Sequence, residues 1–278
     1  MSAETVTAAA PPAGPAPAGR AGLVARGERT RRRPWILMYH AVADPGDDPY
    51  GITVSPARLD RQLRALTRMG LTGVTVATLL RARAEGRDRG LVGLTFDDGY
   101  TDFTEEALPL LRRHGCTATL FVLAGRLGGR NDWDPAGPRR SLVDERHLRT
   151  ALAAGTEIGS HGLYHVDLTT VGDDLLADET VRSRAWLREL TGTAPSGFCY
   201  PYGTVNLRAR AAVRAAGYGY ACAIRPPAPG DGSGPGDGSG PGDGSGPEDP
   251  YALPRTHVSQ ADRVLRLRVK RLRHRLGA

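Results

Sequence analysis

Short apolar runs alternate with amphipathic stretches through most of this chain of 278 residues. The apolar runs have the length of β-strands, and the stretches between them repeat apolar residues at the three- and four-residue spacing of helices. We predict strands at 36–40, 73–76, 91–96, 118–123, 156–160, 197–200, 219–224 and 253–257. We predict helices at 58–69, 104–114, 145–154, 173–191 and 206–216.

Glycine and proline support these boundaries. A glycine follows each predicted helix where a C-cap is expected: Gly70, Gly115, Gly155, Gly192 and Gly217. Pro109 lies inside the second predicted helix and is expected to kink it. Alternating strands and helices predict an α/β fold with parallel strands, either a (β/α)7-8 barrel or a doubly wound open sheet. In both folds the chemistry is expected at the carboxyl ends of the strands.

Two segments lack this pattern. Residues 1–33 are rich in alanine, proline and glycine, which predicts a disordered N-terminal segment. Three copies of Gly-Asp-Gly-Ser-Gly-Pro fill 230–247, and we predict a flexible insert at 228–249. A calcium site at the recurring aspartates is the alternative, but no apolar position accompanies them. The predicted barrel domain is 34–262.

Charge and cysteine content narrow the class of protein. The net charge is +7, and seven basic residues without an acid lie in 263–278, so no nucleic-acid partner is expected. This C-terminal stretch predicts a basic helix, which could contact a membrane peripherally, although a terminal helix with a solvated basic face is favoured. The three scattered cysteines indicate buried thiols. No signal peptide or membrane-spanning run is visible, so a cytoplasmic location is expected.

Two adjacent aspartates end one predicted strand. In Thr95-Phe96-Asp97-Asp98-Gly99 the carboxylates repel each other unless a cation lies nearby. A divalent metal would relieve this repulsion, with one carboxylate as its ligand and the other free as a base. A simple turn is the alternative interpretation.

Two histidines four residues apart follow another predicted strand. In Ser160-His161-Gly162-Leu163-Tyr164-His165 a helical turn would bring both imidazoles to one side, where they could share a metal. Two unrelated histidines are the alternative. One aspartate and two histidines leave positions open for water and substrate, which suits hydrolysis, although oxidative iron chemistry uses a similar set.

These two motifs resemble the first two motifs of the polysaccharide deacetylases, carbohydrate esterase family 4. The similarity extends through Phe198-Cys199-Tyr200-Pro201-Tyr202-Gly203 and covers roughly 34–258. The resemblance implies a distorted (β/α) barrel and one divalent ion, zinc or alternatively Co²⁺, Ni²⁺ or Fe²⁺. It implies Asp98, His161 and His165 as metal ligands and Asp97 as the general base.

The chain departs from the family pattern in its third motif. The family usually carries an arginine there that orients the base, whereas this chain has Phe198-Cys199-Tyr200. Either another arginine supplies the contact or the base is held differently. The backbone N–H of Tyr202 is expected to contribute to an oxyanion site and Tyr202 to contact substrate, with a structural turn as the alternative.

Two histidines are candidates for the general acid, and one tryptophan is a candidate for a sugar contact. The family usually takes a histidine from a late strand, for which His257 is a loose match. The apolar strand 36–40 ends in His40 and resembles the strand that comes first in the subgroup that deacetylates poly-N-acetylglucosamine. We therefore favour His40 as the general acid. Trp133 could line the sugar cleft, or anchor its loop.

The sequence therefore predicts a metal-dependent hydrolase that removes N-acetyl groups from an amino sugar. A catalytically silent carbohydrate-binding protein of the same fold is one alternative. Hydrolysis of a non-sugar amide is another.

Overall fold

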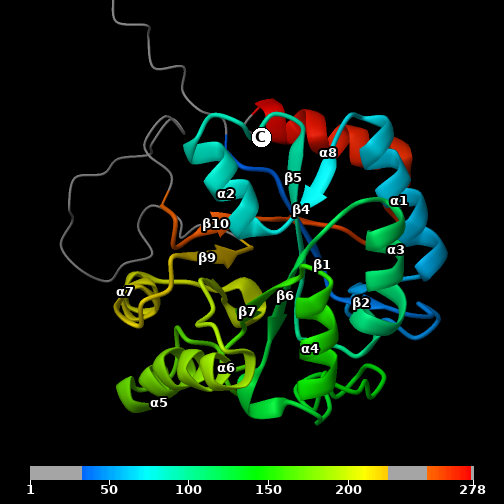
Figure 1. Ribbon diagram of the computed structural model, residues 1–278. Coiled ribbons are helices and arrows are strands. Elements are labelled where there is room, and N and C mark those ends of the chain that lie inside the picture. Colours follow the sequence, from blue (N-terminus) through cyan, green and yellow to red (C-terminus); the bar gives the residue numbers. More distant parts are fainter. Residues whose placement is uncertain (1–32, 225–248, 277–278) are drawn as a thin grey trace, which may run out of the picture. The chain divides into compact units, whose positions relative to one another are not determined.

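Parallel strands form the centre of the domain and helices surround them (Figure 1). The computed structural model describes residues 33–224 and 249–276. Within them a nine-stranded sheet has the order β10-β9-β8-β7-β6-β5-β1-β11, and β4 also pairs with β5. Its strands are β1 (Ile36–Tyr39), β4 (Thr72–Val74), β5 (Leu91–Phe96), β6 (Thr119–Val122), β7 (Glu157–Ser160), β8 (Gly197–Cys199), β9 (Tyr220–Ala223), β10 (Leu253–Pro254) and β11 (Thr256–His257).

One short segment closes the sheet into a barrel. β10 pairs with β9, and β11, which follows after a single residue, pairs with β1 on the opposite side. Arg255 is that single residue, and its side chain is buried. The predicted α/β barrel is thus confirmed, and the open doubly wound sheet is wrong. β2 (Ala41–Val42) and β3 (Thr53–Val54) form a small separate sheet that the sequence pattern did not predict.

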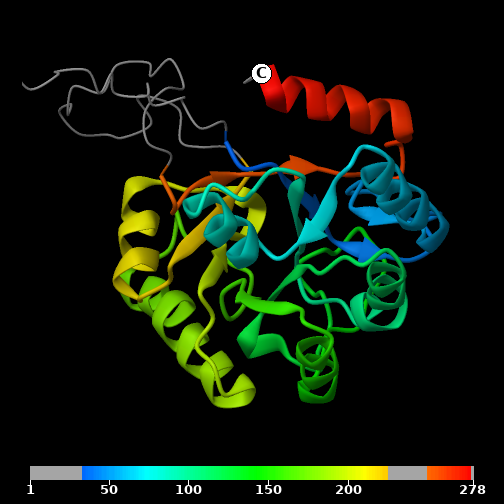
Figure 2. The ribbon, with the colours of Figure 1, turned by 45° about the horizontal axis from the view of Figure 1, so that its top comes forward.

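The helices follow the predicted pattern closely (Figure 2). They are α1 (Pro56–Arg68), α2 (Val76–Ala84), α3 (Leu108–Arg113), α4 (Glu145–Ala153), α5 (Asp173–Ala177), α6 (Ser183–Thr191), α7 (Leu207–Ala215) and α8 (Val264–Leu276). All five glycines predicted to end helices have positive φ. Pro109 is the second residue of α3, directly after the π-helical turn η1 (Phe103–Ala107), so the regular α-helix does not continue through the predicted segment 104–114.

Two other predictions have mixed outcomes. The segment predicted as one helix over 173–191 is α5 and α6 joined by a second π-helical turn, η3 (Asp178–Arg182). Helix α2 was not predicted, because a strand was expected to continue to Val76, where α2 begins after the N-cap Thr75. The three cysteines are buried and unpaired, as predicted.

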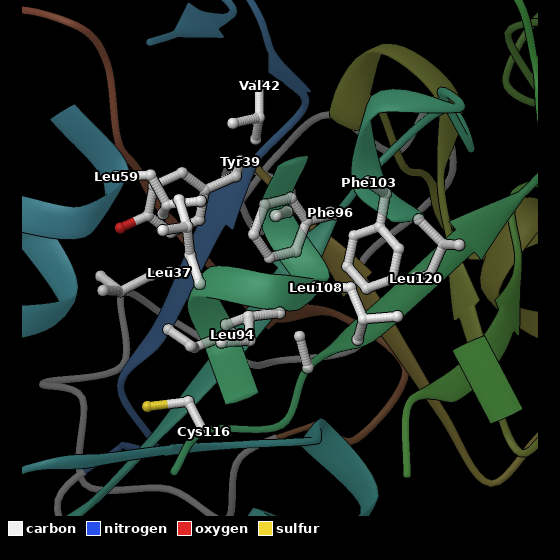
Figure 3. Close-up of a cluster of buried hydrophobic side chains, with 14 of the residues drawn as sticks. Leu37, Tyr39, Val42, Leu59, Leu94, Phe96, Phe103, Leu108, Cys116 and Leu120 are labelled. Atoms are coloured by element: carbon white, nitrogen blue, oxygen red, sulfur yellow. The ribbon is translucent and has the colours of Figure 1, made fainter. Parts of the chain in front are cut away.

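The largest core cluster fills the space between β1, β5 and the helices α1 and α3 (Figure 3). Tyr39 and Phe96, from neighbouring strands, stack with ring centroids 5.1 Å apart, and Phe96 meets Phe103 edge-on at 5.0 Å. Each fully buried side chain of this size contributes about 1.5–3 kcal/mol. This packing anchors β5, whose carboxyl end carries both predicted aspartates.

Several predictions fall on residues that the structure does not describe. They are the disordered segment at 1–33, apart from Arg33, and the insert at 228–249 with its calcium alternative, apart from Asp249. Among the described residues, no helix has the length and apolar content to cross a membrane.

Candidate active site

The predicted site residues gather in one pocket at the carboxyl ends of the barrel strands. Asp97 follows β5 directly, His161 follows β7 and His40 follows β1. The pocket has a volume of about 260 Å³. All the residues predicted for the site line it: His40, Asp97, Asp98, Trp133, His161, His165 and Tyr202.

Asp98, His161 and His165 converge on one point. Oδ1 of Asp98 lies 3.3 Å from Nε2 of each histidine, and all three side chains are buried. Two ligands bound at about 2 Å to one tetrahedral zinc would lie roughly 3.3 Å apart. The three side chains can therefore hold a divalent cation without moving far.

A backbone contact determines which nitrogen of His161 is available. Its Nδ1 lies 2.7 Å from the carbonyl oxygen of Cys199, which can only accept a hydrogen bond, so Nδ1 carries a proton. Nε2 of the neutral ring then presents a lone pair toward Asp98, whose oxygen is also an acceptor. Two facing acceptors require a proton or a cation between them. A backbone acceptor behind the ring is typical of histidines that bind metals.

The electrostatics of the three side chains suit a cation. Burial would raise the pKa of Asp98, but hydrogen bonds from His161 and His165 hold it well below its ordinary value. Burial lowers the pKa of His165, which favours its neutral form. For His161 burial also acts to lower the pKa, but Cys199 and Asp98 outweigh it and raise the pKa well above its ordinary value. A metal ion would displace that proton from His161.

Backbone strain is concentrated in the same pocket. Among the described residues, only three that are not glycine have positive φ: Asp98 at 68°, His165 at 63° and Tyr202 at 59°. All three line the pocket. Left-handed conformations are unfavourable for most residues and persist where the surrounding structure enforces them, often at functional sites.

Glu179 holds the loop that joins the two histidines. It lies in η3 and is fully buried. Its carboxylate accepts hydrogen bonds from the backbone N–H groups of Leu163 at 2.6 Å and Tyr164 at 3.2 Å. Gly162 is required here, because φ is +87° and a Cβ would lie 2.4 Å from Glu179 Oε2. Reasoning from the sequence missed Glu179.

Arg255 holds Asp97, the aspartate beside the Asp98-His161-His165 cluster. Its Nη1 donates to Oδ1 of Asp97 at 2.6 Å, and its Nη2 lies 3.0 Å from Sγ of Cys199. Burial would raise the pKa of Asp97, but Arg255 and His40 hold it below its ordinary value. Asp97 is thus ionised, with Oδ1 occupied by the guanidinium.

Arg255 also accounts for the arginine that is absent from the third motif. Of the two interpretations, the structure matches the first: another arginine contacts the aspartate. Cys199, from the motif itself, packs between them with Sγ 3.6 Å from Oδ2 of Asp97. The sequence did hold a signal, since an arginine inside an apolar strand needs a buried partner for its charge.

Of the two candidate acids, His40 is the one that lines the pocket. Its Nε2 lies 3.8 Å from Oδ2 of Asp97. Among the described residues His257 is not part of the pocket lining, and its ring centroid lies 6.3 Å from that of His40. Of the two histidines, only His40 thus lies within reach of Asp97 inside the pocket.

Aromatic side chains form the outer wall of the pocket. The Trp133 ring stacks on His165 with centroids 4.6 Å apart, and the Tyr202 ring meets His165 edge-on at 4.5 Å. Tyr202 is 52% exposed, which leaves its ring open to a ligand. Tyr50, which the sequence analysis did not single out, also lines the pocket.

Comparison with known proteins agrees with this site. Residues 84–221 match the family model described as polysaccharide deacetylase. The chain is 32% identical over 126 residues to a chitin deacetylase of Pestalotiopsis sp, covering 45% of this chain and 38% of that protein. It spans less than two thirds of the length of the curated relatives it matches.

Two solved structures share the fold. The Streptococcus pyogenes deacetylase PplD in complex with acetate has a TM-score of 0.66 and 21% identity, covering 86% of this chain and 97% of that one. IcaB from Ammonifex degensii has a TM-score of 0.63 and 20% identity, covering 86% and 96%. The matched residues include Asp97, Asp98, His161 and His165. The barrel fold and the buried Asp-His-His cluster agree with the match of residues 84–221 to the polysaccharide deacetylase family.

Proposed function

We propose that this protein is a metal-dependent hydrolase that removes N-acetyl groups from an amino sugar in a polysaccharide, an oligosaccharide or a glycoconjugate. One observation carries the proposal: Asp98 meets His161 and His165 at 3.3 Å, beside an aspartate held ionised by Arg255. Hydrolysis needs a base next to a Lewis acid, whereas a binding module needs neither.

The donor set of the site fits a divalent cation. Asp98, His161 and His165 would hold it, and one carboxylate with two imidazoles leaves coordination positions open. We expect zinc, with Co²⁺, Ni²⁺ or Fe²⁺ as alternatives. When bound, the ion would act as a Lewis acid toward the amide carbonyl and a water molecule.

The neighbouring side chains supply the proton transfers. Asp97 accepts the proton of the attacking water at Oδ2, because Arg255 occupies Oδ1. His40 donates a proton to the departing nitrogen; its Nε2 lies 3.8 Å from Oδ2 of Asp97, so acid and base flank one small volume. The N–H of Tyr202 is suited to the oxyanion, since its strained backbone sits at the pocket.

The aromatic wall supports a sugar substrate. Trp133, Tyr202 and Tyr50 line the pocket with three rings and two hydroxyls, and such rings pack well against pyranose faces. Relatives named chitin deacetylase and peptidoglycan-N-acetylglucosamine deacetylase act on acetylated sugars by name. The position of His40 at the end of β1 supports the subgroup that deacetylates poly-N-acetylglucosamine.

The two alternatives differ in what supports them. The hypothesis of a catalytically silent carbohydrate-binding protein was supported only by the absence of an arginine from the third motif. Arg255 makes the contact to Asp97 instead, so this support no longer applies. A non-sugar amide as substrate has no observation in its favour.

Acetate release tests the proposal directly. The full chain, stripped of metal and then titrated with Zn²⁺, Co²⁺, Ni²⁺ or Fe²⁺, is given N-acetylglucosamine oligomers, monomeric conjugates and non-sugar acetamides side by side. We expect metal-dependent acetate release from the sugars, and its loss in Asp97→Asn. Asp132→Asn, on an exposed acid of the Trp133 loop, is the matched control. Release from the non-sugar amides alone, or from nothing with any metal, would contradict the proposal.

A further inference from the structure

Helix α8 (Val264–Leu276) presents two opposite faces of different character. Its inner face packs on the domain through Leu267, which is fully buried. On the same face Lys270 donates to the carbonyl of His257 and to Asp262, and Arg271 donates to the carbonyl of Met69. The helix is therefore fixed to the domain by one side alone, and Figure 2 shows it, in red, at the edge of the fold.

The outer face carries an exposed apolar stripe. Leu265, Val269, Leu272 and Leu276 are 72%, 41%, 55% and 73% exposed. Their spacing of four, three and four residues confines them to an arc of about 60° at 3.6 residues per turn. An apolar stripe opposite the packed face has no role in holding the helix to the domain, so it is available to a partner.

Two rows of arginines flank this stripe. Arg266 and Arg273 lie on one side of it, and Arg268 and Arg275 on the other, all of them exposed. Helix α8 contains no acidic residue. Among the described residues, Arg268, Arg273 and Arg275 have no carboxylate within ion-pair distance, and Arg266 has only Asp262 at 3.8 Å. The positive charge of this face is largely uncompensated.

We propose that this face of α8, the stripe with its flanking arginines, docks on an anionic lipid surface, with the helix parallel to the membrane plane. The stripe would enter the boundary between headgroups and acyl chains, and the arginines would meet lipid phosphates. A second copy of the chain fits poorly, because two such faces would oppose arginine to arginine. A nucleic acid would use the arginines and leave the stripe uncovered. The proposal is independent of the proposed deacetylase activity.

Co-sedimentation with lipid vesicles tests the proposal on the full chain. The vesicles are phosphatidylcholine alone, or phosphatidylcholine and phosphatidylglycerol in equal parts, at low and at high salt. We expect binding to the mixed vesicles only, weakened by salt. Leu265→Ser/Leu272→Ser should lower the partition coefficient about a hundredfold. Arg266→Gln/Arg273→Gln should lower it about twenty-five-fold, at roughly fivefold per arginine.

Matched controls come from other helices. Leu207→Ser changes a leucine of α7 that is 64% exposed. Arg149→Gln/Arg182→Gln removes the same charge from exposed arginines of α4 and η3. Both controls should bind vesicles like the unchanged protein, and all variants should keep their thermal midpoint and their acetate release from soluble oligomers.

Three results would overturn the proposal. The unchanged protein could fail to bind the mixed vesicles at low salt. The leucine variant could bind as well as the unchanged protein while the arginine variant does not, which would indicate a polyanion site without membrane contact. Sedimentation velocity could reveal a dimer without lipid that the leucine variant abolishes, which would assign the stripe to self-association.

Discussion

Carboxylates lie at both ends of the barrel, half-buried at the amino end and buried at the carboxyl end, and their hydrogen-bond partners differ. At the amino end Glu157, the first residue of β7, accepts hydrogen bonds from the N–H of Ala77 at 3.0 Å and the hydroxyl of Thr119 at 2.8 Å. Its other oxygen accepts from the hydroxyls of Tyr220 at 2.9 Å and Ser196 at 3.1 Å. Four neutral donors thus satisfy one anion.

At the carboxyl end the partners are charged or able to titrate, and the bonding is incomplete. Asp97 and Asp98 face Arg255 and three histidines. Among the described residues, the buried atoms Nδ1 of His40, Nδ1 of His165 and Nε of Arg255 have no hydrogen-bond partner. A buried or half-buried carboxylate whose hydrogen bonds are all made by neutral donors stabilises a fold. A group of charged side chains with strained backbone and unpaired polar atoms is expected where a ligand or a proton binds.

Among the substitutions at the two ends of the barrel, that of Asp98 should cause the largest loss of activity. Asp98→Asn removes an anionic candidate ligand. Residues that only hydrogen-bond to a metal ligand typically cost roughly 10- to 100-fold when they are changed, and we expect metal affinity and kcat to fall by more than this. The fold should persist, because removing one of two adjacent buried anions relieves repulsion. Calorimetric metal titration, acetate release and a thermal melt measure the three quantities. A variant that binds metal normally would refute the assignment of the ligand.

Substitution of Arg255 should have the next largest effect. Burial raises the pKa of Asp97 and Arg255 lowers it, so Arg255→Met should let the pKa rise. Activity that needs ionised Asp97 is lost as the pH falls through this pKa, so the acidic limb of the kcat/KM profile should move to higher pH. At neutral pH we expect a loss of about 10- to 100-fold.

Arg255→Lys is the control for this prediction, because it keeps the charge and loses the second contact, to Cys199. Its acidic limb should remain near that of the unchanged protein. Removing one partner of a buried ion pair typically costs about 3–5 kcal/mol of stability, so the Met variant should also melt earlier. An unmoved limb in the Met variant would show that Arg255 does not set the charge of Asp97.

Glu179→Gln should weaken metal binding at the carboxyl end without changing a candidate ligand. Glutamine keeps the size of the side chain but turns an N–H₂ group toward the backbone donors of Leu163 or Tyr164. The loop between the histidines would then loosen, and we expect metal to bind about tenfold more weakly. Saturating metal should restore most of the activity. Glu189→Gln, an exposed change on α6, should leave the metal affinity unchanged; an unchanged affinity in Glu179→Gln would assign it a purely structural role.

Local pattern was enough to predict most of the fold and to place the candidate metal-binding residues near one another. Seven of the eight predicted strands occur as single strands, whereas the segment predicted as one strand over 253–257 forms β10 and β11 on either side of Arg255. The glycines that end helices are set by backbone conformation alone. The two aspartates and the two histidines of these motifs could be predicted to lie together because each motif directly follows a strand, and parallel strands bring their carboxyl ends to one edge. The choice of Asp98 rather than Asp97 as a candidate ligand came from the family resemblance.

Arg255 and Glu179 could not be assigned because their roles depend on contacts across the barrel. Arg255 lies 158 positions from Asp97 in the sequence, and only closure through β10 and β11 brings them together. Glu179 occupies the inward face of its helix with Leu176 and Ser183. An acid on a buried helix face is a visible signal, but the sequence does not say which backbone groups it would meet.

The smallest catalytic effect is expected at the amino end. In Glu157→Gln the amide N–H₂ can face the hydroxyls of Tyr220 and Ser196, which can turn to accept. The four hydrogen bonds then lose the strength that the negative charge adds, and stability should fall by roughly 1–3 kcal/mol. The same change should leave kcat and metal affinity near those of the unchanged protein, because the strands between the two ends are tightly packed and do not transmit so small a shift. Thermal melts and acetate release measure both, with Glu189→Gln as the exposed control. If kcat fell together with the melting temperature, the amino end would contribute to catalysis. The assignment of stability to the amino end and of chemistry to the carboxyl end would then be wrong.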